Sequence, residues 1–127
     1  MKDFIKVTKA LSDPNRVEII KMLQQRAMFV SEVQAALGIS QPAVSKHLKV
    51  LENAGLVSFH KEGAWVSYRV ANGANSPYAA SILGNLKHWL ENAPKITELQ
   101  ARLPDIHRAV FSKASVDEEN SGNLQRA

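Results

Sequence analysis

The sequence predicts a mainly α-helical domain that contains one small β-hairpin. Over most of the chain, apolar residues recur every three or four positions, which is the period of an amphipathic helix. Between Val57 and Val70 the period changes to two, which is typical of half-buried strands. Glycine and proline stand at the boundaries of these stretches, where helices start and stop. Together these patterns indicate four helices, a hairpin and then one or more terminal helices.

The composition is that of one globular domain. The chain has 127 residues, which is enough to bury a core without disulfides or metals. It has no cysteine, so disulfides, thiolate metal ligands and cysteine nucleophiles are excluded. The net charge of +4 suits a polyanionic partner. No secretory signal is recognisable and no apolar run is long enough to span a bilayer, so we expect a cytoplasmic protein without membrane contacts.

Two helices are expected before residue 26. The first covers about residues 2–11 and is too short to be stable alone, so it must pack on another element or on a partner subunit. The second begins after Asp13, which is a good N-cap, with Pro14 at the first helical position, and it runs to about Gln25. An apolar connector follows at residues 27–30.

The stretch Ser31–Leu51 predicts two short helices joined by a tight turn. Ser31 and Gln34 have the spacing of a capping box, so the first helix is expected to start there. It ends before Gly38, because glycine readily takes the left-handed conformation found just past a helix end. Two helices around a short turn with glycine form a helix-turn-helix, which places its second helix in the DNA major groove.

The second helix of this pair is expected to begin at Gln41. Ser40 offers an N-cap hydroxyl, and Pro42 lies in the first turn, where its missing N–H costs nothing. Apolar residues at i, i+4 and i+7 form a stripe for the core: Val44, Leu48 and Leu51. The other sides are polar and cationic, although lysines on an outer helix face can also be merely solvated.

Residues 57–70 predict a two-stranded hairpin, with the turn at Lys61–Ala64 containing the glycine that a tight connection needs. An isolated hairpin is only marginally stable, so one face must rest on the helices. Its tip is then expected to project freely.

After a polar linker, a helix is expected to begin at Ser76-Pro77. Its apolar band is broad and contains Ile82, Leu83, Leu86, Trp89, Leu90 and Ala93. A core helix could carry such a band, but its width favours burial between two subunits. Pro94 is expected to break or kink this helix, and a further segment runs from Lys95 until Pro104.

The domain is expected to cover residues 1–111, with a last turn near Phe111. Residues 112–127 are polar and poor in apolar side chains, so we expect a mobile tail. This tail has two basic and three acidic residues, so the remaining 111 residues carry a net charge of +5.

This order of elements is that of a winged helix-turn-helix, and the sequence resembles the ArsR family of small bacterial repressors. Three stretches carry the resemblance: ALSDPNRVEIIKML at 10–23, LGISQPAVSKHLKVLENAGLV at 37–57 and KEGAWVSYRV at 61–70. The resemblance covers about residues 3–92, and SQPAVSKHL followed by AGLV is its most specific part. It implies a homodimeric transcriptional repressor that dimerises through its N-terminal and C-terminal helices and leaves its promoter when an effector binds.

Residues for these roles can be named. The candidate DNA contacts are Ser40, Gln41, Pro42, Ser45, Lys46, His47, Lys49, Lys61 and Arg69. The candidate dimerisation residues are Phe4, Ile5, Leu11, Ile82, Leu83, Leu86, Trp89 and Leu90. The Gln41 amide suits an adenine edge in an inverted-repeat operator on double-stranded DNA. His47 borders the buried stripe, so it is either a histidine at the edge of the core or a donor to phosphate.

The wing departs from many relatives. They carry an arginine just after the wing glycine, whereas this chain has Ala64, which argues against deep insertion into the minor groove. Trp65 is expected to cover the hairpin rather than to contact DNA.

The effector is not identified by the sequence. Arsenic-sensing relatives carry two cysteines as ELCVC, and Phe29 and Ser31 stand at those positions here, so soft-metal sensing is not expected. Asp105 and His107 form a D-x-H, but no paired histidines follow it, so we read it as coincidence and predict no metal or cofactor.

Three hypotheses stay open. The first is a repressor that responds to a small organic molecule, bound against an apolar wall whose residues could equally be plain core: Met28, Phe29, Tyr78 and Trp89. The second is a metal-responsive repressor with nitrogen and oxygen ligands across the dimer. The third is a winged helix that binds protein. An enzyme is not expected, because the chain lacks a glycine-rich phosphate loop, paired carboxylates and a setting for a nucleophile.

Overall fold

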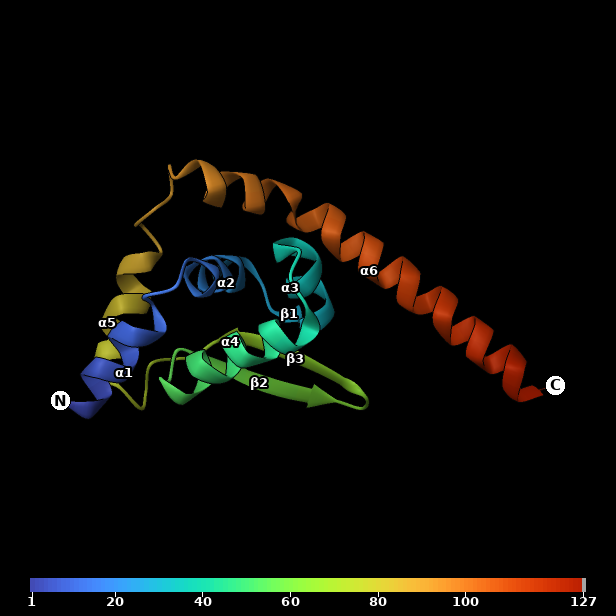
Figure 1. The fold of residues 1–127 in the computed structure, drawn as a ribbon, viewed down its shortest axis with the longest axis horizontal. Coiled ribbons are helices and arrows are strands. Elements are labelled where there is room, and N and C mark those ends of the chain that lie inside the picture. Colours follow the sequence, from blue (N-terminus) through green and yellow to red (C-terminus); the bar gives the residue numbers. More distant parts are fainter. Residues whose placement is uncertain (127) are drawn as a thin grey trace.

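The computed structural model describes the backbone of residues 1–126 and the side chains of residues 1–111. Its elements are α1 (Lys2–Ala10), α2 (Pro14–Gln25), β1 (Met28–Phe29), α3 (Val30–Leu37), α4 (Gln41–Asn53), β2 (Val57–Glu62), β3 (Trp65–Val70), α5 (Pro77–Leu86) and α6 (Pro94–Arg126). Figure 1 shows α1 beside α5 at one end, while α6 passes over α2 and α3 and projects beyond them. The predicted mainly helical fold with a small sheet is confirmed.

The core is built from the apolar stripes of the helices. The predicted stripe of α4, Val44, Leu48 and Leu51, is fully buried. Helix α2 is covered most completely, because six consecutive residues from Glu18 to Leu23 are buried. Residues of α1, α5 and α6 complete the same cluster, so the terminal helices belong to the domain core.

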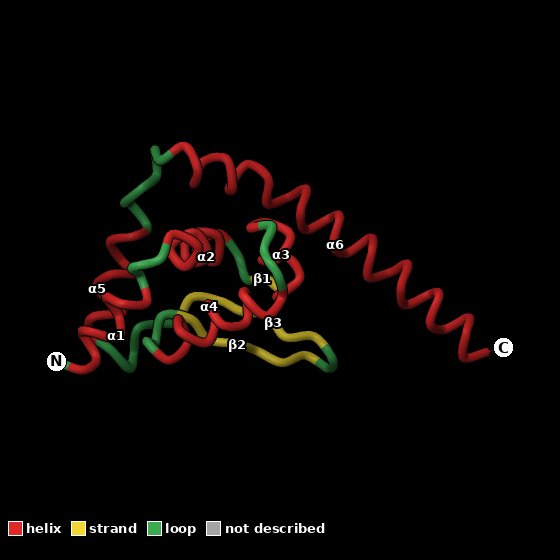
Figure 2. Tube along the Cα trace, viewed as in Figure 1, coloured by secondary structure: helices red, strands yellow, loops and turns green. Residues whose placement is uncertain are grey.

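The sheet has three antiparallel strands in the order β1-β3-β2, one more than the predicted hairpin (Figure 2). Met28 pairs with Tyr68 and Phe29 with Ser67, so the predicted connector is a short strand. A strand of two residues is too short to show an alternation of apolar and polar side chains, so the sequence pattern did not reveal β1. The hairpin turn is Gly63-Ala64, and Gly63 has a φ of +60°, which glycine adopts without strain.

Helix α5 is shorter than predicted. The apolar band suggested a helix through Ala93, but α5 ends at Leu86, and turns follow in which Leu90 has a φ of +64°. The buried Lys21 side chain accounts for this end, because its Nζ donates to the carbonyl oxygens of Leu86 at 2.5 Å and Trp89 at 2.9 Å. A cation at the last carbonyls stabilises a helix end.

Helix α6 is longer than predicted. It begins at Pro94 and continues through Pro104, where the sequence suggested an end. An internal proline removes one helical hydrogen bond, so contacts with other elements must offset its cost. The backbone stays helical to Arg126, and the mobility of the tail at 112–127 stays a prediction. Within the described residues, no helix has both the length and the apolar character that a membrane span requires.

Candidate nucleic-acid interface

Helices α3 and α4 form the predicted pair around a tight turn. Gly38 ends α3 with a φ of +67°, and the Ser40 hydroxyl accepts a hydrogen bond from the Ala43 amide at 3.3 Å to cap α4. The start of α3 differs from the prediction. No capping box forms between Ser31 and Gln34, because the helix already begins at Val30, directly after β1.

Helix α4 has one buried and one exposed face. Val44 and Leu48 are completely buried. The predicted DNA contacts on the opposite side are exposed to solvent, namely Gln41, Pro42, Ser45, Lys46 and Lys49. An exposed Ser40 lies at the N-terminus of the helix, where amide N–H groups favour an anion. This face is therefore polar, cationic and free of covering elements within one subunit.

His47 lies between the two faces. Its side chain is half-buried, and its Nδ1 atom is 3.3 Å from Nη1 of Arg16 on α2. The ring therefore contacts the body of the domain on one side, as a histidine at the edge of the core would. Its other ring nitrogen is left for a second partner.

The two wing cations do not lie together. Lys61 and Arg69 are both exposed, but Arg69 pairs with Ser58, three positions before Lys61, so their side chains leave opposite faces of the hairpin. Arg69 lines an open groove of about 480 Å³ with Glu52 at the base of the wing. Lys61 is the cation nearer the hairpin tip.

Trp65 contacts α6 and is partly exposed to solvent. The centroid of its ring lies 5.0 Å from that of Phe29 and 6.4 Å from that of Phe111. The planes of Trp65 and Phe111 are nearly parallel, with an angle of 5° between them. This agrees with the expectation that Trp65 covers the hairpin. The contact also ties the wing to α6.

The predicted dimerisation residues divide into three groups by exposure. Leu83 and Leu86 are only 6% exposed and belong to the core of the subunit, and their role in a dimer interface stays a prediction. Leu11 and Ile82 are half-buried. Four others are between 40% and 54% exposed: Phe4, Ile5, Trp89 and Leu90. Exposed apolar surface therefore gathers on α1 and in the loop after α5.

The apolar wall proposed for an effector does not form within one subunit. Met28 is buried in the core, and Phe29 packs against Trp65 and Phe111. Tyr78 packs instead on Phe4 of α1, with ring centroids 5.5 Å apart. Trp89 is 54% exposed after α5, so the four residues do not line one wall within a subunit, and their role in effector binding stays a prediction.

The D-x-H at Asp105 and His107 does not converge on one point. Asp105 accepts a hydrogen bond from Arg108 at 2.6 Å, whereas His107 contacts Glu32 on α3. Within the described side chains, no three His, Asp or Glu residues are grouped as a metal site would require.

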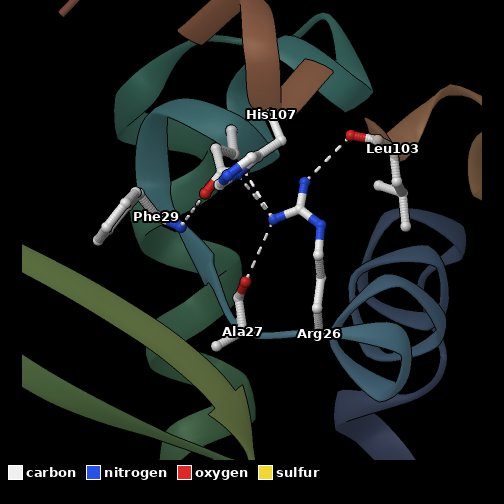
Figure 3. A network of polar contacts seen from close by, with 6 residues as sticks. Arg26, Ala27, Phe29, Leu103 and His107 are labelled. Atoms are coloured by element: carbon white, nitrogen blue, oxygen red, sulfur yellow. Dashed lines mark hydrogen bonds and ion pairs between the residues drawn. The ribbon is translucent and has the colours of Figure 1, made fainter. Parts of the chain in front are cut away.

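A polar network centred on the buried Glu32 fastens α6 to α3 (Figure 3). The Glu32 side chain is 1% exposed and accepts hydrogen bonds from the Phe29 amide at 3.0 Å, Arg26 Nη1 at 2.8 Å and His107 Nδ1 at 2.9 Å. Arg26 also donates to the Leu103 carbonyl oxygen at 3.1 Å. Burial alone would raise the pKa of Glu32, but these hydrogen bonds and the Arg26 charge outweigh it, so the pKa lies below its ordinary value.

Sequence reasoning missed this network. The available signal was the spacing of Phe29 and Glu32, which matches the reciprocal half of a capping box. Phenylalanine is not an N-cap residue, so the pattern was assigned to Ser31. Arg26 lies six positions before Glu32 but belongs to no recognised capping pattern, and His107, 75 positions away, leaves no local pattern at all.

Comparison with known proteins adds sequence and fold relatives. A family model described as bacterial regulatory protein, arsR family, matches residues 13–58, which contain α2, α3 and α4. The HTH-type transcriptional repressor SmtB of Mycobacterium tuberculosis is 41% identical over 64 residues, covering 50% of this chain and 47% of SmtB. The chain thus spans about half the length of that relative.

Two solved structures resemble about seven tenths of this chain. HlyU from Vibrio cholerae is 30% identical with a TM-score of 0.59, covering 71% of this chain and 92% of HlyU. The winged helix-turn-helix domain of Mb0332 from Mycobacterium bovis, described as homodimeric and DNA-binding, is 27% identical with a TM-score of 0.57, covering 73% of this chain and 86% of that domain. With the matched motif helices and this fold, the chain belongs to the arsR family of bacterial regulatory proteins.

Proposed function

We propose that the chain is a sequence-specific, cytoplasmic DNA-binding regulator that works as a homodimer and represses transcription. The observation that carries the proposal is the two-faced character of α4. Its apolar face is completely buried, while Gln41, Ser45, Lys46 and Lys49 lie exposed on the other. Family membership supports the same assignment, since SmtB is named a transcriptional repressor and Mb0332 a DNA-binding domain.

The exposed residues of α4 suit different contacts. Gln41, in the first turn, can pair with an adenine edge through its amide. Lys46 and Lys49 suit phosphates, which fix the register of a protein on the duplex. Ser40 and the neighbouring amides can hold another phosphate at the helix N-terminus.

Dimerisation is proposed through the exposed apolar side chains on α1 and after α5, which include Phe4, Ile5, Trp89 and Leu90. Several large apolar side chains exposed on neighbouring elements are typical of an interaction site. Two α4 helices related by a twofold axis would enter successive major grooves, so the operator would be an inverted repeat with half-sites about 10 bp apart. A small-molecule effector would release the dimer from its operator. No pocket is assigned to this effector.

The test is selection of genome-derived DNA fragments with the purified full chain. We expect enrichment of fragments with a common inverted repeat, and the neighbouring genes would indicate the class of effector. Lys46→Ala should then lower the slope of log affinity against log salt by roughly one per phosphate contact in each subunit. Lys87→Ala, an exposed lysine outside α4, is the matched control and should leave the slope unchanged.

Gln41→Ala tests base reading. We expect a loss of about 1–3 kcal/mol at one base position of each half-site, and little change elsewhere. Selection that enriches no sequence, with duplex binding that is weak and insensitive to salt, would instead favour a winged helix that binds protein.

A further inference from the structure

We propose that Arg16 is a positioning residue that orients His47 as a hydrogen-bond donor to a DNA phosphate. The inference rests on the proposed function of α4 and adds a contact to it. It also assigns a role to the first helical turn of α2, which lies outside the helix-turn-helix itself.

The Arg16 guanidinium is fixed by contacts with three elements. Nε donates to the Ala10 carbonyl oxygen at 2.6 Å and Nη2 to the Lys9 carbonyl oxygen at 3.2 Å, so Arg16 caps the C-terminal end of α1. Nη1 lies 3.8 Å from Oδ2 of Asp13, the N-cap of α2. The same Nη1 is 3.3 Å from Nδ1 of His47 on α4. With its side chain 18% exposed, the group has little freedom to move.

This contact determines the form of the His47 ring. A guanidinium has only donors, so a hydrogen bond from Arg16 requires Nδ1 of His47 as its acceptor and places the ring proton on Nε2. His107 differs, because its Nδ1 faces the Glu32 carboxylate at 2.9 Å as well as Arg26 at 3.3 Å. Since the two ring nitrogens point in different directions, the Nε2–H is directed away from Arg16.

Phosphate is the acceptor that fits this donor. The half-buried ring neighbours the exposed Lys46 on α4, whose outer face we assign to DNA. Phosphate oxygens take half or more of the hydrogen bonds in protein–DNA interfaces, and neutral side-chain donors supply many of them. Because Arg16 also caps α1, which carries the exposed Phe4 and Ile5, the position of this donor is tied to the helix assigned to dimerisation.

A first experiment reads the tautomer without DNA. Long-range 1H–15N spectra of the 15N-labelled full chain, at a pH where free histidine is neutral, should show His47 with its proton on Nε2. Arg16→Gln should shift this signal towards a mixture of tautomers. His47→Asn identifies the resonance by its loss. A wild-type ring with the proton on Nδ1, or a signal that Arg16→Gln does not move, would overturn the proposal.

A second experiment measures affinity for a selected operator fragment at several salt concentrations. His47→Asn keeps an acceptor for Arg16, but its amide donor lies nearer the backbone than Nε2 and does not reach the same phosphate, so we expect roughly ten-fold weaker binding. The salt slope should stay unchanged, because the variant removes no lysine or arginine. Arg16→Gln should weaken binding similarly, and the double variant should bind no worse than His47→Asn alone.

The matched control is Arg102→Gln. Like Arg16, Arg102 donates to a carbonyl oxygen at the end of a helix, namely that of Ala36 in α3, at 3.1 Å. It lies far from His47 in sequence and contacts another face of the domain. It should change neither the tautomer nor the affinity of folded protein. Wild-type affinity in His47→Asn, or a reduced salt slope, would overturn the inference while leaving DNA binding itself intact. Loss of all DNA binding by the wild-type chain would instead refute the proposed function.

Discussion

Helices α4 and α6 are held in place in different ways, one by signals within a few residues and the other by contacts between distant elements. Local signals define α4: the Ser40 cap, the left-handed Gly38 and a regular apolar stripe. Helix α6 contains Pro104 and is held by Arg26, just after α2, and by Glu32 of α3, both remote from it in sequence. Helix α4 is defined by local signals, whereas the position of α6 depends on tertiary contacts.

The largest effect is expected from Leu48→Ala in the buried stripe of α4. Leu48 is completely buried, so the truncation should lower the free energy of unfolding by about 3 kcal/mol through lost burial and a cavity. Urea unfolding followed by circular dichroism measures this. Lys49→Ala, on the exposed side of the same helix, should change stability by less than about 0.5 kcal/mol. Equal effects of the two variants would contradict the two-faced description of α4.

Glu32→Gln tests the network that fastens α6. Removing one partner of this buried cluster should cost about 2 kcal/mol near neutral pH. Because the folded-state pKa of Glu32 is lowered, its stabilisation is present above the ordinary value of about 4.3 and is lost as the pH falls through the lower folded-state value.

The stability difference between wild type and Glu32→Gln should therefore shrink on acidification below about pH 4. Urea unfolding over a pH series gives this difference. Glu98→Gln is the control, because Glu98 is exposed on α6 and its contact with Arg102 is 4.0 Å long. A difference between wild type and Glu32→Gln that does not vary with pH would show that the carboxylate charge is not what stabilises the network.

Gly38→Ala probes the turn between α3 and α4. A Cβ at this position would meet no atom within 4 Å, so its cost comes from the φ of +67° alone. We expect a loss of about 1 kcal/mol in thermal or urea unfolding. A gain in stability would mean that the turn is not left-handed in solution.

Ser31→Ala should have the smallest effect. The sequence pattern made Ser31 an N-cap, which would cost about 1 kcal/mol on removal. In the structure Ser31 lies inside the first turn of α3, exposed and without a capping role, so stability should change by less than about 0.5 kcal/mol. A full capping loss in urea unfolding would restore the original assignment.

These contrasts show how far sequence reasoning reaches. The bounds of α2 and α4 follow from Asp13, Ser40 and the apolar periods, which act over a few residues. The end of α5 does not follow from such local signals. The side chain that determines it, Lys21, lies 65 positions from Leu86. The same holds for His107 and Glu32, which are 75 positions apart.

The candidate site divides along the same line. The exposed face of α4 could be assigned from its helical period alone. The contact between Arg16 and His47 could not, because it joins two helices 31 positions apart. The opposite placement of Lys61 and Arg69 was implicit in the alternation of a strand, but only the register of the hairpin made it visible.

The most direct test of the account is a hydroxyl-radical footprint of the full chain on a selected fragment. We predict two protected patches about one helical turn (~10 bp) apart on the same side of the duplex, centred on an inverted repeat. Both patches should weaken together when Lys46 is replaced by alanine. A single patch from a bound monomer, or uniform cleavage along the fragment, would contradict the assignment of α4 to the major groove of DNA.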